Sequence, residues 1–324
     1  MSTETAAVTA ADVERAAVEL SRHLRPTPLQ LSHAFSREAN ARVYLKLESV
    51  QPIRSFKLRG ALNKVSRIPA EQRRAGVITA SAGNHGMGVA FAAAECGAPA
   101  TVYVPENANQ LKVEAIKRLG ATVVAAGRSY SAAYQAAVEA QKTTGATLVH
   151  AYEDPDVVAG QGTVGLELLA DVPDLDVAFV PVGGGGLIGG ISLYLKAMRP
   201  SIRVIGVEPE GADAMRRSLE TGRIVTLDRV DTIADGLAAS APGPLTLALA
   251  QRYVDQVVTV SDDEMLRAIR LLFEWEHLLA EPGGAAAVAG LLKHGGVVPA
   301  GRVAVIVSGA NATAEVMLEA LRPS

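Results

Sequence analysis

The chain has 324 residues, enough for about two domains of ordinary size, and a formal net charge of -3. This charge, with no basic run interleaved with aromatic residues, argues against nucleic acid as a partner. No apolar run reaches the ~18 residues of a membrane span, so no membrane partner is expected. Cys96 is the lone cysteine and the N-terminus lacks a signal-peptide core, which together predict a cytoplasmic protein.

Hydrophobic residues make up 49% of the chain but aromatic residues only 4%, so the core is built mainly from Ala, Val, Leu and Ile. Such a core is typical of parallel strands covered by helices. In chain order, Thr9–Leu20 has the spacing of an amphipathic helix, Tyr44–Glu48 alternates like a strand, and Leu58–Val65 returns to helical spacing. Lys57 therefore falls where a strand-like run gives way to a helix.

From Gly76 onward, strand-like and helix-like runs alternate along the chain. The expected strands are residues 77–80, 100–104, 122–125, 147–149, 177–182, 203–207, 257–260 and 302–307. The expected helices are residues 85–96, 110–119, 131–143, 162–169, 187–198, 261–279 and 313–321, and Ser261 to Glu264 forms a capping box. This alternation predicts an α/β fold with two open, mostly parallel, helix-covered sheets.

Lys57 stands near a predicted helix N-terminus, where the helix dipole penalises a cation by a few tenths to ~1 kcal/mol. A lysine held neutral or masked covalently avoids this cost, and desolvation lowers a lysine pKa in the same direction. The alternative is an ordinary surface lysine on an amphipathic helix. The neighbouring motifs decide between these two interpretations.

A glycine run, Gly183 to Gly186, follows an expected strand and opens an expected helix. Backbone N–H groups bared at a helix N-terminus suit a phosphate. The spacing Gly184-x-Gly186-x-x-Gly189, with Glu208 at the end of the next strand, also passes the test for a dinucleotide-binding fold. This run therefore predicts a phosphate ligand, either a dinucleotide or a phosphate monoester, with a purely structural glycine turn as the alternative.

A second loop, Ser81 to Gly86, also joins an expected strand to an expected helix. Its backbone amides can bind a substrate carboxylate through Ser81, Ala82, Gly83, Asn84 and His85. The structural alternative is a tight turn that tolerates Asn84 in a left-handed conformation. His85 is interpreted as a capping or packing residue, and His150 and His277 lack metal-ligand spacing.

Five motifs, in one order along the chain, resemble those of the fold type II pyridoxal-phosphate enzymes, in particular the threonine/serine dehydratase and serine racemase branch. They are Ser55 to Ala61 (SFKLRGA), Ser81 to Gly86 (SAGNHG), Gly183 to Leu187 (GGGGL), Ala234 to Gly236 (ADG) and Ser308 to Asn311 (SGAN). They cover the chain from about Pro26 to Asn311. A dinucleotide would leave Lys57 and the Asn84 loop without a role, whereas pyridoxal 5'-phosphate employs both.

The resemblance implies a role for each motif. It makes Lys57 the residue that holds pyridoxal 5'-phosphate covalently and that acts as the catalytic base. The other implied cofactor-binding residues are Asn84 at the phenolic oxygen, Gly183, Gly184, Gly185, Gly186 and Leu187 at the phosphate, Gly236 where the backbone approaches the cofactor, and Ser308 at the pyridine nitrogen. Phe56 is expected at the ring face of the cofactor, with a core aromatic residue as the alternative.

Ser308 is informative about the reaction, although a serine at a strand end is by itself a typical turn former. A neutral hydroxyl cannot hold a proton on the pyridine nitrogen as an aspartate would. The ring then becomes a milder electron sink, so β-elimination is favoured over transamination.

Two departures from the family pattern matter. Serine racemases carry a second serine as a base where this chain has Ala82, and an alanine cannot move a proton. Dehydration is therefore expected rather than racemisation. Glu208 and the Ala212 carbonyl match the family's divalent-cation site, but its further carboxylate position is Ala214 here. The incomplete set favours no bound cation, or a weakly held Mg²⁺.

The resemblance also implies a domain organisation and an assembly. A small domain at residues 68–150 is inserted into a large cofactor-binding domain made of residues 1–67 and 151–324, and the protein is a homodimer or homotetramer. The chain ends at Ser324, soon after Asn311, so the C-terminal regulatory domain of larger biosynthetic threonine deaminases is not expected.

The expected function is dehydration of a small β-hydroxy amino acid, L-threonine or L-serine, to a 2-oxo acid and ammonia. Alternatives are another substrate with the same motifs (3-hydroxyaspartate, phenylserine or a hydroxyectoine-derived intermediate), a serine racemase, a dinucleotide-binding oxidoreductase and a non-catalytic amino-acid-binding module. The pocket near Ile53 and Arg54 and the stretch from Ala238 to Pro244 are expected to select the substrate.

Overall fold

The computed structural model describes residues 8–295 and 301–322, and within these ranges the strands form a larger, six-stranded sheet and a smaller, four-stranded sheet. In spatial order the larger sheet consists of β1 (Leu29–Ser32), β2 (Arg42–Leu47), β10 (Arg302–Val307), β7 (Val177–Pro181), β8 (Arg203–Pro209) and β9 (Gln256–Val260). The smaller sheet consists of β5 (Thr122–Ala125), β4 (Ala100–Val104), β3 (Val77–Ala80) and β6 (Thr147–Leu148).

Strands β1 and β2 pair antiparallel, and the other described pairs are parallel. The predicted α/β fold with two helix-covered, mostly parallel sheets is therefore confirmed. The proposed domain boundaries at residues 68 and 150 stay a prediction.

The helices that precede or accompany the smaller sheet are α1 (Ala10–Leu20), α2 (His33–Ala39), α3 (Lys57–Arg67), α4 (Ala70–Arg73), α5 (Asn84–Glu95), α6 (Gln110–Arg118) and α7 (Tyr130–Thr144). The later helices are α8 (Pro155–Asp171), α9 (Gly186–Met198), α10 (Ala214–Thr221), α11 (Pro244–Tyr253), α12 (Asp262–Glu276), α13 (Pro282–His294) and α14 (Ala314–Ala320). Three short 3₁₀ turns lie among the described residues at Glu48–Val50, Glu210–Ala212 and Asp235–Leu237. None of the helices in the described ranges has the length and apolar character that a membrane crossing requires.

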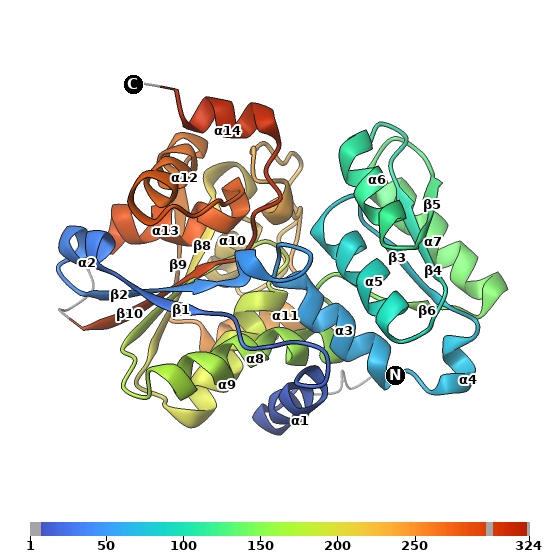
Figure 1. Cartoon of the computed structure of the whole chain (residues 1–324), viewed down its shortest axis with the longest axis horizontal. Coiled ribbons are helices and arrows are strands. Elements are labelled where there is room, and N and C mark those ends of the chain that lie inside the picture. The colour runs from blue at the N-terminus through green and yellow to red at the C-terminus, as the bar shows by residue number, and fades with distance from the viewer. Residues whose placement is uncertain (1–7, 296–300, 323–324) are drawn as a thin grey trace.

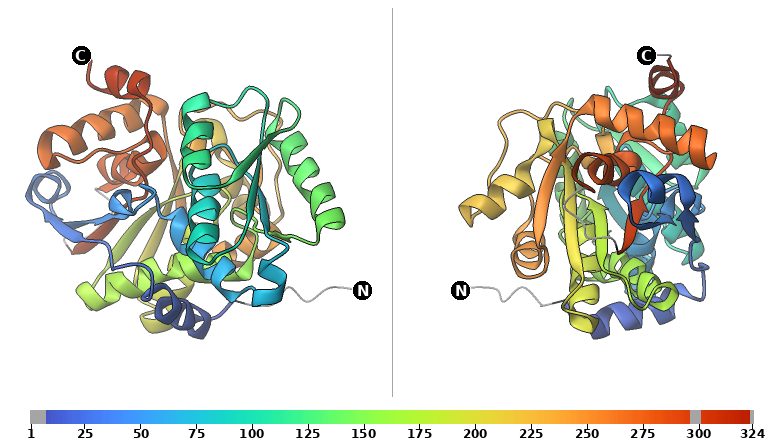
Figure 2. Two further views of the ribbon diagram at one scale, coloured as in Figure 1. Left: turned by 45° about the vertical axis from the view of Figure 1, so that its right-hand side comes forward. Right: turned by 90° about the vertical axis from the view of Figure 1, so that its left-hand side faces the viewer.

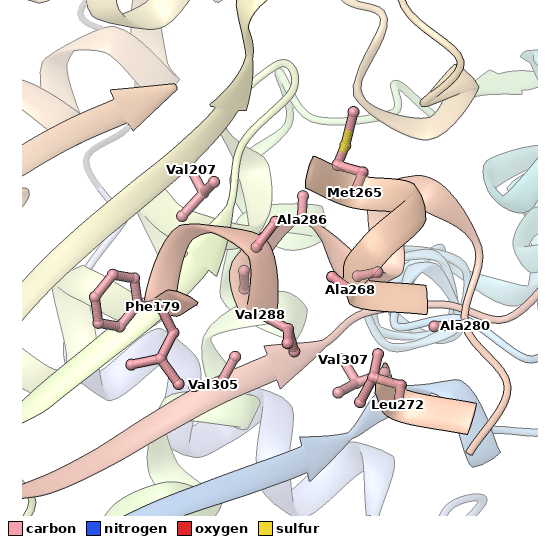
Figure 3. Close-up of a cluster of buried hydrophobic side chains, with 14 of the residues drawn as sticks. Phe179, Val207, Met265, Ala268, Leu272, Ala280, Ala286, Val288, Val305 and Val307 are labelled. Atoms are coloured by element: carbon pink, nitrogen blue, oxygen red, sulfur yellow. The ribbon is translucent and has the colours of Figure 1, made fainter. Parts of the chain in front are cut away.

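Helices cover both faces of the larger sheet. Successive side chains of its central strands point to opposite faces, so each of these strands contributes to two cores. Val177 and Phe179 of β7 pack with α12 and α13, whereas Ala178 and Val180 pack with α8 and α9. Figure 1 shows α12 and α13 on one side of this sheet and α8 and α9 on the other. Figure 3 shows the first of these cores, in which Phe179 and the labelled valines of the strands (Val207, Val305 and Val307) lie around α13, which carries Val288.

The smaller sheet has the same layered construction. Val77 packs with α3 and α5, and its neighbour Ile78 packs with Ala133 and Ala137 of α7. Figure 2 (left) shows α5 and α7 on opposite sides of this sheet. Helix α3 lies between the two sheets (Figure 1) and contacts both α5 and α8. The residues at the N-terminus of α3 are therefore held between the smaller and the larger sheet.

Several helix ends follow from local chemistry. The predicted capping box of α12 is confirmed, since Glu264 N donates to Ser261 Oγ at 3.2 Å and Ser261 N donates to Glu264 Oε2 at 2.7 Å. That helix ends at Glu276, earlier than expected, because His277 adopts a left-handed conformation with φ of 55°. Helix α8 starts earlier than expected because Asp154 caps it ahead of Pro155.

Candidate active site

Lys57 is the first residue of α3, as the predicted strand-to-helix junction requires. The loop that delivers it is held by the segment after β10. Phe56 N donates to Ser308 O at 3.1 Å, and Ala310 N donates to Arg54 O at 2.9 Å. These bonds continue strand-like pairing past the end of β10. They fix the start of α3 relative to that strand.

The Lys57 amine is partly buried and donates to the Ala151 carbonyl at 3.1 Å. Burial lowers the pKa of Lys57 to about 8, although the Glu281 carboxylate acts in the opposite direction. The amine can therefore lose its proton near neutral pH, as a covalent or basic lysine must.

An ionic cluster, made of Lys46, Glu48, Arg59 and Glu167, lies close to Lys57 along α3. Arg59 pairs with Glu48 at 2.8 Å and with Glu167 at 2.6 Å, and Lys46 pairs with Glu167 at 2.7 Å. Burial alone would raise the pKa of Glu48, but the Arg59 guanidinium holds it below its usual value. The cluster joins α3 to α8 and β2, so it fixes the helix that carries Lys57.

The glycine run leads from β7 into α9, and its packing leaves no room for side chains. A Cβ at Gly184 would overlap the Tyr152 ring, and one at Gly185 would lie 2.5 Å from Met215 Cε. Gly185 also has φ of 92°, which other residues rarely adopt. The first N–H groups of α9 lack helical partners, so the run presents donors to an anion.

Further contacts bring the other predicted residues to this run. Gly183 lies against the Ala234–Gly236 turn, since a Cβ on Gly183 would be 3.3 Å from Gly236 O. Tyr152, which packs on the run, directly follows Ala151, the acceptor for the Lys57 amine. Lys57, Gly236 and the glycine run therefore meet in one region, and Leu187 continues the run into α9.

Asn84 opens α5 at the carboxyl end of β3, with Gly83 at the N-cap. Its Nδ2 donates to Glu281 Oε1 at 2.6 Å, and its Oδ1 accepts from Asn311 Nδ2 at 2.7 Å. Ser81 Oγ accepts from Gly83 N at 3.2 Å and so shapes the loop. The Asn84 loop, which follows a strand of the smaller sheet, thus contacts Glu281 and Asn311, which lie in segments next to the larger sheet.

The histidines near Lys57 are neutral groups. His85 is buried with Nε2 2.9 Å from Val149 O, and burial lowers its pKa to about 3. Burial also lowers the pKa of His150 to about 4, and its Nδ1 accepts from Tyr152 N and Glu153 N. Neither ring is suited to carry a proton near neutral pH, which agrees with the packing role expected for His85.

The roles of Ser308 and Phe56 stay predictions, and the Phe56 ring packs against the core of the larger sheet. Ser308 is buried directly after β10 and donates from Oγ to Gly283 O at 3.2 Å. The Phe56 ring centroid lies 5.2 Å from Lys57 Nζ. Ala82 is partly buried and packs against the apolar core of the smaller sheet.

Glu281, which the sequence analysis did not single out, is the N-cap residue of α13. Its carboxyl is turned toward Asn84, and burial raises its pKa to about 7 despite the hydrogen bond from Asn84. The signal was the sequence Glu281-Pro282-Gly283-Gly284, an acid placed before a helix-starting proline. A glutamate there is also a common helix N-terminal residue, so the pattern alone does not reveal a site.

Glu208, which forms the possible cation site of the sequence analysis with the Ala212 carbonyl, has backbone amides as its hydrogen-bond partners. The Glu208 oxygens accept from Met215 N at 2.9 Å and Arg216 N at 2.8 Å, and burial raises the Glu208 pKa to about 8. Asp213 is paired with Arg217 at 2.7 Å and also with Arg216. No cluster of three or more His, Cys, Asp or Glu residues suited to a metal occurs in the described ranges.

The family model described as "Pyridoxal-phosphate dependent enzyme" matches residues 20–309. The chain belongs to this family. It is similar to the L-threonine ammonia-lyase of Thermotoga maritima, with 43% identity over 304 residues, which are 94% of this chain and 76% of that protein.

Two solved structures are similar to this chain along nearly its whole length. The processed form of threonine deaminase isoform 2 from Solanum lycopersicum has a TM-score of 0.91 and 34% identity, covering 98% of this chain and 95% of that one. Maize serine racemase has a TM-score of 0.92 and 34% identity, covering 97% of each chain. The fold is therefore shared by lyases and a racemase, and does not by itself select the reaction.

The residues of this pyridoxal-phosphate dependent enzyme fit its cofactor. Lys57 supplies an amine that can be neutral, and the side-chain-free glycine run supplies backbone donors for a phosphate. Asn84 retains an N–H beyond the one given to Glu281. The family assignment excludes the alternative of a dinucleotide-binding oxidoreductase.

Proposed function

We propose that this pyridoxal-phosphate dependent enzyme is an L-threonine ammonia-lyase that also accepts L-serine. It converts either substrate to a 2-oxo acid and ammonia. The proposal is supported by the relative of 43% identity named L-threonine ammonia-lyase, which matches 94% of this chain. Threonine and serine share the β-hydroxyl group that leaves in this reaction.

Ala82 is the observation that carries the choice of elimination over racemisation. Racemisation needs a proton donor on the face of Cα opposite Lys57, and a methyl group cannot supply one. The neutral, buried His85 beside it is no substitute, because its pKa of about 3 keeps it unprotonated near neutral pH. Lys57 then acts as the base at Cα without a second base opposite it.

The chain's own residues position the substrate and move its protons. The bound cofactor supplies the electron sink that stabilises negative charge at Cα. The backbone of residues 81–85, at the N-terminus of α5, holds the substrate carboxylate. Lys57 removes the Cα proton, and the β-hydroxyl group leaves as water. The enamine product then takes up one water and gives the 2-oxo acid and ammonia.

A substrate screen tests this proposal. Purified protein loaded with pyridoxal 5'-phosphate is assayed for ammonia and 2-oxo acid release from L-threonine, L-serine, 3-hydroxyaspartate, phenylserine and a hydroxyectoine-derived amino acid. We expect L-threonine to give the highest kcat/KM. A higher value for 3-hydroxyaspartate, phenylserine or the hydroxyectoine-derived amino acid would reassign the substrate, and no ammonia from any of the five substrates would contradict the lyase proposal.

Ala82→Ser tests the choice of reaction. The variant should raise racemisation relative to elimination, because the new hydroxyl can deliver a proton opposite Lys57. The measurement is the ratio of D-amino acid formed to 2-oxo acid released. An unchanged ratio would contradict the role assigned to position 82.

We also propose that the protein is a cytoplasmic homodimer or homotetramer with a small domain at residues 68–150. The net charge of -3 and the single cysteine support a cytoplasmic location. The resemblance to the fold type II enzymes supports a homodimer or homotetramer. Light scattering on the purified protein gives the oligomeric state, and a monomer would contradict it.

A further inference from the structure

The Asn84 side chain is held at both of its polar atoms. Its Nδ2 donates to Glu281 Oε1 at 2.6 Å, and its Oδ1 accepts from Asn311 Nδ2 at 2.7 Å. An amide nitrogen can only donate, so Asn311 Nδ2 distinguishes the two ends of the Asn84 amide, and the ionised Glu281 carboxylate reinforces the choice as an acceptor. A flipped Asn84 would place oxygen against oxygen and nitrogen against nitrogen.

Asn311 is itself fixed, which makes it a reliable donor. Its Nδ2 donates one hydrogen to Ile53 O at 2.9 Å and the other to Asn84. Ile53 belongs to the loop that leads to Lys57, and the Lys57 loop is bound to the Ser308–Ala310 segment through backbone bonds. The orientation of Asn84 is therefore set by the same segment that positions Lys57.

Glu281 is committed to Asn84 by its surroundings. Its backbone N donates to Gly309 O at 3.0 Å, and its side chain makes no capping bond to α13. A Cβ at Gly309 would overlap the Glu281 carboxyl and lie 3.4 Å from Asn84 Nδ2. Glycine at position 309 thus leaves the space in which the carboxyl and the amide meet.

We propose that Glu281 and Asn311 are positioning residues that hold the Asn84 amide in one orientation and aim its second N–H at the phenolic oxygen of the cofactor. This inference rests on the cofactor being pyridoxal 5'-phosphate. One N–H of Asn84 goes to Glu281, and the other has no partner within residues 8–295 and 301–322. The contact also joins α5, beside the smaller sheet, to α13, beside the larger one (Figure 1).

A double-mutant cycle on cofactor retention tests the inference. The variants are Glu281→Ala, Asn84→Ala and the double variant, each loaded with cofactor, and the dissociation rate of the cofactor is followed by its visible absorption. We expect about tenfold faster loss in each single variant, because a hydrogen bond is lost or misaligned. The double variant should be no worse than Asn84→Ala, because Glu281 acts through Asn84.

Conservative variants separate positioning from charge and from folding. Glu281→Gln keeps an oxygen for Asn84 and should retain cofactor almost as well as wild type, whereas Gly309→Ala should displace the carboxyl and resemble Glu281→Ala. The exposed Glu274 of α12 supplies the matched control, Glu274→Ala, which should leave retention unchanged. If Glu281→Ala does not fold, Glu281→Asp, which is one methylene too short, enters the cycle in its place.

Two outcomes would overturn the inference: additive losses in the double variant, or a Glu281→Gln protein that loses cofactor as fast as Glu281→Ala. Both concern cofactor retention in variants and do not depend on the substrate. A wild-type protein that retains cofactor but releases no ammonia from threonine would contradict the proposed function and leave this inference standing.

Discussion

Two groups of charged side chains near the start of α3 have opposite character. In the ionic cluster, Arg59 and Glu48 are at most 2% exposed, yet each is paired and stays charged. At the active site, burial pushes Lys57 and Glu281 toward their neutral forms, with pKa values of about 8 and about 7. The paired cluster serves the fold, whereas the under-paired groups can exchange protons.

The difference follows from what surrounds each group. Glu167 and Glu48 offer Arg59 four carboxylate oxygens, and Thr163 adds a hydroxyl acceptor at 3.0 Å. The amine of Lys57 has the neutral carbonyl of Ala151 as its acceptor. A charge without a full set of partners is costly when it is buried, so the site keeps a lysine that is ready to react.

Lys57→Ala should have the largest effect on activity. Loss of both the covalent anchor and the base is expected to lower ammonia release from threonine roughly a thousandfold or more. The apoprotein should remain as stable as wild type, because the substitution removes an amine that burial destabilises in its charged form. Lys64→Ala, on the same helix, is the matched control and should keep near-normal activity. Comparable loss in both variants would erase the distinction between the two lysines.

Arg59→Met should have the largest effect on folding. It leaves the Glu48 and Glu167 carboxylates without their main cation, which costs about 3–5 kcal/mol in the free energy of unfolding. Urea denaturation of the apoprotein measures this cost. Arg67→Met, at the more exposed end of the same helix, breaks its pair with Asp156 and should cost under ~1 kcal/mol. Equal costs would show that the cluster has no special structural role.

The pH dependence of stability should reveal the raised pKa of Glu281. Its pKa is raised from 4.5 to about 7 on folding, so the folded chain binds a proton there that the unfolded chain releases. The stability linked to this group is present below about pH 4.5 and is lost as pH rises through 7.

The melting temperature of the wild-type apoprotein should therefore fall between pH 5 and 8 relative to that of Glu281→Gln. Lys112 and Asp235 are common to both proteins, so the difference reports Glu281 together with its effect on Lys57, whose pKa the Glu281 carboxylate raises. Parallel pH profiles would contradict the raised pKa.

Removal of divalent cations should have the smallest effect. Both oxygens of Glu208 already accept backbone hydrogen bonds, and Asp213 is paired with two arginines. Ammonia release is expected to be unchanged after EDTA treatment and dialysis. A loss that added Mg²⁺ or Ca²⁺ restores would show that a cation binds despite these contacts.

The regular part of the fold could be predicted because alternating strands and helices leave a periodic trace. The strand-to-helix junction at Lys57 and the capping box at Ser261 are local features that the sequence carries. Helix α13 was not predicted, since it is buried along nearly its whole length and begins Pro-Gly-Gly, so it shows neither an amphipathic stripe nor strong helix propensity.

The same limit explains why Glu281 was missed. Its partner Asn84 lies 197 positions away along the chain, and no local pattern reports such a contact. The motifs of the site could be found because each stands at a strand end, where parallel sheets gather their functional loops. The helix that completes the site could be found only in three dimensions.

Identification of the lysine that carries the cofactor tests the central claim most directly. The protein is loaded with pyridoxal 5'-phosphate, reduced with borohydride and digested, and the peptide that bears the cofactor is sequenced by mass spectrometry. We predict that the yellow colour is lost on reduction and that the label is found on Lys57. A label on another lysine, or a protein that stays colourless with added cofactor, would contradict the account.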